Sequence, residues 1–138
     1  MPVTDEQVER VLKEISVGAD HPQHVASLVG AFMRRQPTVG HYVQSHSSDL
    51  GMEGVVLTLL HASAIVRAVE LSQGRALRVL AAADLDRASK AGGELKGEKA
   101  IETYLSSNLT DDDPTLGGKK RPVVLQLLRL VARASIDI

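Results

Sequence analysis

GMEGVVLTLLHASAIVRAVELS, residues 51–72, decides the fold of this chain. The stretch is apolar almost all the way round a helix, and such a helix must be covered by protein or lipid on every side. Glu53, His61, Arg67 and Glu70 interrupt it. Because each charge near the centre of a bilayer costs about 2.5–3.5 kcal/mol, we expect no membrane span. The sequence therefore predicts a central helix that is wrapped by the rest of the chain.

The segments on both sides of this stretch also repeat their apolar residues at helical intervals. Thr4 and Gln7 have the spacing of a capping box, and prolines suit the first turns of helices near residues 22 and 122. A further helix is predicted over residues 75–91, and no segment alternates long enough to be a strand. We predict an all-α fold, a single-domain bundle over residues 1–138 with about six helices around the central apolar helix.

Residues 108–121 interrupt the helical pattern. They join an acidic tract, Pro114, two glycines and a basic cluster. The glycines lack the spacing of a phosphate-binding loop, and the three aspartates lack the alternating ligands of a calcium loop. We therefore predict a mobile, solvated loop at 108–121.

Composition narrows the function classes. The chain has no cysteine, a net charge of −1, and only Phe32, Tyr42 and Tyr104 as aromatic residues. Disulfides and zinc–thiolate sites are thereby excluded. Nucleic-acid binding is not expected, because it normally uses a basic face or several stacking aromatics. The first residues are acidic and amphipathic, unlike a signal peptide, so we expect a cytoplasmic protein.

The five histidines do not form a metal-binding pattern. They are His21, His24, His41, His46 and His61. No His-Glu-x-x-His or Glu-x-x-His motif places ligands together on one helix face. We expect no metal and no cofactor.

Three polar residues of the central helix form the candidate ligand-binding set: His61, Arg67 and Glu70. His61 should point into the protein or an interface, where either a hydrogen bond from a neighbouring helix satisfies it or a ligand contacts it. Arg67 and Glu70 share another side of the helix. They form either an internal or interfacial ion pair, since an unpaired buried charge is costly, or a pocket for a charged small ligand.

The last helix, predicted over residues 122–134, is nearly as apolar as the central one. Gln126, Arg129 and Arg133 are its only polar residues before the C-terminal end. Such a helix is either threaded into the core or shared with a second chain. Because two apolar helices are more than a small bundle readily covers, we predict a homodimer, the commonest closed assembly. The predicted interface residues are Val124, Leu127, Leu128 and Val131.

The sequence carries no recognisable nucleophile–base pair, so we do not expect an enzyme and assign no catalytic residue. Our first hypothesis is a self-associating helical interaction or regulatory module, with a further protein partner left open. The alternative is a small-ligand or metal-binding bundle that uses His61 and the Arg67/Glu70 side of the central helix.

Overall fold

The computed structural model describes residues 2–16, 21–92, 95 and 97–138, and this part of the chain is helical without any strand. The predicted all-α fold is confirmed, with one more helix than the six expected. The elements are α1 (Asp5–Ser16), α2 (Pro22–Arg35), α3 (Pro37–Gln44), α4 (Ser47–Gln73), α5 (Ala82–Lys90), α6 (Lys99–Asn108), a 3₁₀ turn η1 (Gly118–Lys120) and α7 (Arg121–Ile136).

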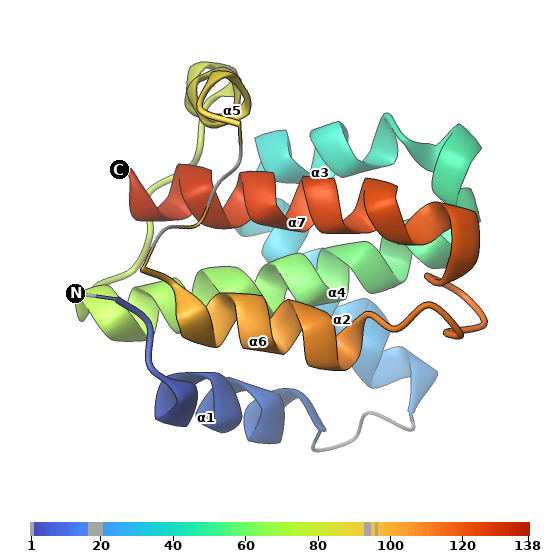
Figure 1. Cartoon of the computed structure of the whole chain (residues 1–138), viewed down its shortest axis with the longest axis horizontal. Helices are drawn as coiled ribbons and strands as arrows, with labels where there is room; N and C mark the ends of the chain where they lie inside the picture. Colours follow the sequence, from blue (N-terminus) through green and yellow to red (C-terminus); the bar gives the residue numbers. More distant parts are fainter. Residues whose placement is uncertain (1, 17–20, 93–94, 96) are drawn as a thin grey trace.

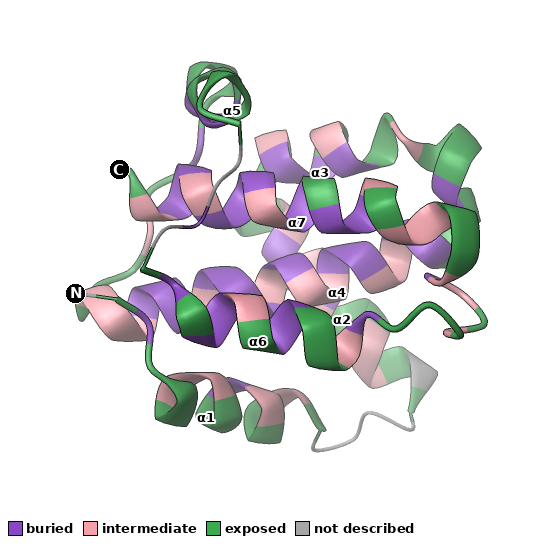
Figure 2. Ribbon diagram, in the orientation of Figure 1, coloured by how far each residue is buried: buried purple, intermediate pink, exposed green. Residues whose placement is uncertain are grey.

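The central apolar helix is α4, and the other helices pack around it. It contacts α7, α1, α2 and α3. Figure 1 shows α6 and α7 in front of α4, with α2 and α3 behind and α1 along one edge. Buried residues are concentrated on α4, α6 and α7, whereas α1 is mostly exposed (Figure 2). The core therefore lies along α4, as its composition requires.

Two glycines set the limits of the straight part of α4. Gly51 has φ 73° and ψ 168°, which bends the helix after its first turn and is accessible in practice only to glycine. Gly74, in the left-handed region with φ 70°, ends the helix, and its N–H donates to the Glu70 carbonyl at 2.9 Å. By length and composition α4 could cross a membrane, but 61% of its most apolar window is buried within this chain.

The helix predicted over residues 75–91 begins later than expected. Residues 75–81 are not helical, and α5 starts at Ala82. The buried side chain of Gln36 explains the difference: its Nε2 donates to the Arg78 carbonyl at 2.9 Å, and its Oε1 accepts the Leu80 N–H at 2.8 Å. These long-range hydrogen bonds hold the segment in a non-helical conformation, so tertiary contacts override the local helical pattern.

The segment predicted as a loop, 108–121, is largely irregular but is anchored to the fold. Leu109 and Leu116 are fully buried. Asp113 Oδ1 accepts the N–H groups of Thr115 and Leu116 at 2.9 and 2.8 Å, and these bonds lower the pKa of Asp113. Arg121 Nε also donates to the Leu109 carbonyl at 2.7 Å. The mobility of this loop stays a prediction, which amide hydrogen exchange can test.

Helix α7 lies inside the single chain, so its burial needs no second chain. It packs against α4 and α5. The four predicted interface residues are buried in these intramolecular contacts, with exposed fractions of 0–2%: Val124, Leu127, Leu128 and Val131. Of the two options left open by the sequence, threading into the core is the one observed. These side chains are therefore not available to a second folded chain.

Candidate functional site

Glu70, near the end of α4, is a buried carboxylate that pairs with the half-exposed Arg35 at the end of α2. Glu70 is 3% exposed. Its Oε2 accepts hydrogen bonds from Arg35 Nη2 and from the Leu77 N–H, both at 2.7 Å. A buried carboxylate needs such partners. The internal ion pair expected for Glu70 is therefore present, although Arg35 rather than Arg67 supplies the cation.

Arg67 lies one turn away and is only loosely held. Its side chain is 43% exposed, and its Nε is 3.6 Å from Oε2 of Glu14 on α1. Glu14 is also 3.5 Å from Arg10. Exposed ion pairs of this kind contribute about 0–1 kcal/mol to the free energy of unfolding. Arg67 and Glu14 are therefore free to exchange partners at little cost.

Arg67 and Glu70 line the same groove, which runs between α1 and α2 above α4 and has a volume of about 170 Å³. Its floor contains the buried side chains of Phe32 and Val66, and Ile15 and Leu28 on its sides are partly exposed. Pockets for drug-sized molecules usually measure about 300–1,000 Å³. This groove instead has room for one or two apolar side chains. We call it the α1–α2 groove.

His61 is separate from this groove and binds Tyr104 on α6. Its Nδ1 lies 2.5 Å from the Tyr104 hydroxyl, with the rings edge to face at 5.7 Å between centroids. Burial lowers the pKa of His61, a shift that the Asp113 carboxylate partly opposes, and burial raises the pKa of Tyr104 well above its usual range. Both shifts favour a neutral imidazole beside a protonated phenol, and the tautomer of His61 sets which of the two donates. The predicted hydrogen bond from a neighbouring helix is confirmed.

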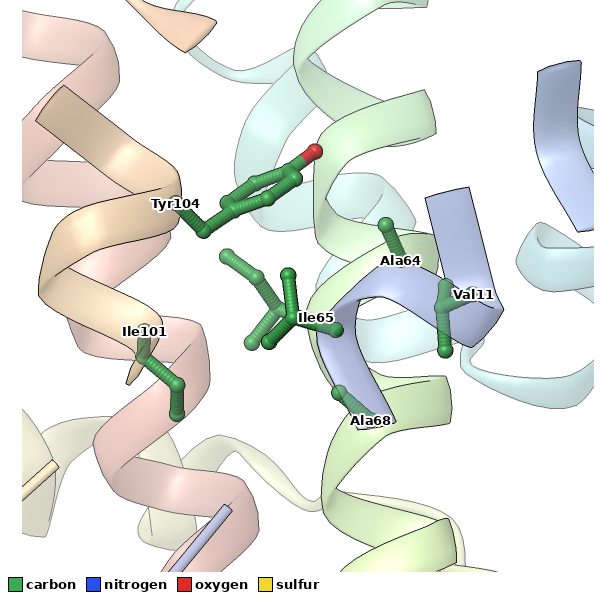
Figure 3. Close-up of a pocket in the computed structure, with 7 residues that line it drawn as sticks. Val11, Ala64, Ile65, Ala68, Ile101 and Tyr104 are labelled. Carbon is green, nitrogen blue, oxygen red and sulfur yellow. The ribbon is translucent and has the colours of Figure 1, made fainter. Parts of the chain in front are cut away.

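The cavity next to Tyr104 has little capacity for a ligand. It measures about 10 Å³, which is room for one water at most. Figure 3 shows its apolar lining, with Ile65, Ala64 and Ala68 from α4, Val11 from α1, and Ile101 and Tyr104 from α6. This part of the structure is core, with His61 and Tyr104 joining α4 to α6.

A larger pocket, of about 440 Å³, lies along α7 between α3 and the C-terminal end of α5. Its lining includes Arg121, Gln126 and Arg129 together with Tyr42 and Ser89. One feature of the sequence indicated a polar surface here, namely the stripe of α7 that contains Gln126 and Arg129. Nothing in the sequence indicated that α3 and α5 would enclose that stripe.

The described residues contain no group of three or more histidine, aspartate or glutamate side chains placed to hold a metal ion. Comparison with protein-family models, curated proteins and solved structures finds no match to this chain.

Proposed function

We propose that this chain is a self-associating helical interaction module that forms a twofold dimer through the α1–α2 groove. The observation that carries the proposal is the incomplete coverage of this groove. Leu28 and Ile15 are only partly covered by the chain's own atoms, and the buried floor residues Phe32 and Val66 lie beneath them. When a partner covers apolar surface of this kind, the complex is stabilised by about 25 cal/mol per Å² of area removed from water.

The charges of the two helices that flank the groove support a second copy as the partner. Helix α1 carries four carboxylates against two cations, whereas α2 carries Arg34 and Arg35 and no carboxylate. In a twofold contact each surface meets its own copy, so α1 of each chain can lie against α2 of the other. An acidic α1 then lies against a basic α2 at two symmetry-related contacts, which favours this arrangement of the two chains.

The size of the groove supports a protein partner over a small molecule. At about 170 Å³ it can take one or two side chains, as in recognition of a helix by an apolar groove. A partner's Leu28 is the side chain we expect to enter it. The loosely paired Glu14 and Arg67, 45% and 43% exposed, can then exchange partners across the dimer axis.

The alternative ligand site is less well supported. His61 is bonded to Tyr104 and does not line the α1–α2 groove, and both hydrogen bonds to the Glu70 carboxylate come from the chain itself. Arg67 alone does not define a binding site.

We also expect the dimer to act in the cytoplasm as a non-enzymatic protein, since the chain has no cysteine and needs no oxidising compartment.

Light scattering on Leu28→Asp tests this function. The wild type should be a dimer at high micromolar concentration, and Leu28→Asp should be a folded monomer, because a charge would enter the apolar contact. The matched control is Val79→Asp, a change at a side chain that is 54% exposed outside the groove, and it should remain a dimer. A monomeric wild type, or a dimeric Leu28→Asp, would refute the proposal.

A further inference from the structure

The 440 Å³ pocket along α7 is distinct from the α1–α2 groove and has the size of a small-molecule site. Three elements enclose it: α3 through Tyr42, α5 through Ser89, and α7 through residues of its first three turns. Figure 1 shows α5 nearly end-on above α7, the helix against which it packs. Of the α7 residues that line the pocket, Pro122 and Gln126 are exposed.

The charge in this pocket is unbalanced. Arg121 and Arg129 line it, and no acidic side chain does so among the residues described. Glu102 neutralises Arg129 through a two-point contact, with Nε and Nη2 at 3.0 and 3.1 Å from the carboxylate oxygens. Arg121 has no ion-pair partner in the described part of the chain. The pocket therefore holds one uncompensated positive charge.

Arg121 is also held in place. Its Nε donates to the Leu109 carbonyl at 2.7 Å, which fixes the plane of the guanidinium and leaves both terminal nitrogens as donors. The backbone N–H of Arg121 is occupied by the Gly118 carbonyl in the preceding 3₁₀ turn. The attraction for an anion thus comes from the side chain and does not depend on the N-terminus of α7.

The remaining lining suits an organic molecule rather than a bare ion. Pro122, Leu125 and Leu130 give one apolar wall, and the half-buried Tyr42 adds an aromatic ring. The Ser89 hydroxyl and the Gln126 amide can complete the hydrogen bonding of an oxyanion. Pockets with an apolar lining and a few fixed polar groups are typical ligand sites.

We infer that this pocket binds a small organic oxyanion, a carboxylate or phosphate on an apolar body, with Arg121 as the anchoring cation. A guanidinium pairs with a carboxylate or a phosphate through two parallel hydrogen bonds. The two ligand classes therefore share the feature that Arg121 would recognise, an oxyanion attached to a ring or short chain. The inference does not depend on dimerisation, because the pocket and the α1–α2 groove share no lining residue.

Titration with benzoate, phenyl phosphate and inorganic phosphate, followed by amide NMR of the full chain, tests the inference. Benzoate or phenyl phosphate should shift the amide signals of Ser89, Leu125 and Gln126. Stronger binding of benzoate would identify a carboxylate site, and stronger binding of phenyl phosphate a phosphate site. Inorganic phosphate should bind more weakly than phenyl phosphate, because it lacks the apolar body.

Two glutamine variants give a matched pair. Gln126→Glu places a negative charge in the pocket at an exposed position, and should weaken binding of the organic anion at least about tenfold. Gln23→Glu makes the same charge change at an exposed residue of α2 outside the pocket, and should leave affinity unchanged. Absence of shifts at millimolar probe, or equal weakening by both variants, would overturn the inference.

Discussion

Helix α7 and the α1–α2 face differ in how completely their own chain covers them. Helix α7 is the more apolar of the two by sequence, and its own chain covers it almost completely. Of its 16 residues only Pro122 and Gln126 are exposed. By the same measure seven of the 12 residues of α1 are exposed, and Ile15 and Leu28, which line the groove, are partly exposed. An apolar pattern shows that a helix must be covered, whereas only the packed structure shows what covers it. The less apolar face is therefore the better candidate for a contact between chains.

The largest expected effect is a difference in stability between Leu128→Asp and Leu28→Asp, which make the same substitution on the two faces. Leu128→Asp should abolish cooperative thermal unfolding, because Leu128 is fully buried and a buried unpaired charge adds several kcal/mol to the roughly 1.5–3 kcal/mol of lost burial. Leu28→Asp should cost no more than about 1–1.5 kcal/mol in the unfolding of the monomer, since Leu28 is partly exposed. Circular dichroism during heating measures both. Similar melting of the two variants would mean that the two faces do not differ in coverage.

A second effect concerns the two glutamates of the α1–α2 groove. Glu70→Ala should lower the free energy of unfolding by about 1–3 kcal/mol, because the Leu77 N–H and Arg35 lose their buried acceptor. The control Glu14→Ala removes only exposed pairs and should cost about 0–1 kcal/mol. Urea titration followed by circular dichroism gives both values. Equal costs would show that Glu70 is not a structural anchor.

The loop that covers the start of α7 depends on a glycine. A Cβ on Gly117 would lie 2.5 Å from the Asp111 and Asp113 carbonyl oxygens, so Gly117→Ala should destabilise the fold by about 1–3 kcal/mol. In α2, a Cβ on Gly30 would meet only Arg34 Nη1, at an ordinary 3.6 Å. Gly30→Ala should therefore stabilise the helix by about 0.5–1 kcal/mol. Urea titration that finds both changes neutral would contradict this description of the loop.

The smallest effect is a pH dependence at the contact between α4 and α6. Because burial lowers the pKa of His61, the unfolded chain binds a proton first as pH falls below about 6.5. Stability from this group should be constant above that pH and decline below it, by at most about 1.4 kcal/mol per pH unit for one proton. Urea titration at pH 7.5, 6.5 and 5.5 should show this slope in the wild type and lose it in His61→Gln. An unchanged slope in the variant would assign the titration to other groups.

Local patterns in the sequence were sufficient to predict the helical architecture. The apolar run from residue 51 and the stop signal at Gly74 depend on neighbouring residues, and both agree with α4. The non-helical segment after Gly74 was missed because it is held by Gln36, more than forty positions away along the chain. No local pattern in the sequence contains such a contact.

The candidate site was only partly predictable for the same reason. The polarity of Arg67 and Glu70 placed them correctly on one side of α4, where both line the α1–α2 groove. The partner of Glu70 was not predicted, because Arg35 comes from another helix. The position of α7 in the core depends on how α4 and α5 meet it, which composition alone does not determine.

Sedimentation equilibrium with two charge-reversal variants tests the central claim most directly. Glu14→Lys reverses a charge on the acidic helix α1, and Arg34→Glu reverses one on the basic helix α2; both residues are exposed. Each variant alone should dimerise more weakly than the wild type, because like charges then face one another across the axis. Their equimolar mixture should regain wild-type affinity as a heterodimer, and added salt should reduce the differences. A monomeric wild type, or a mixture that associates no better than its components, would contradict a dimer formed by α1 against α2.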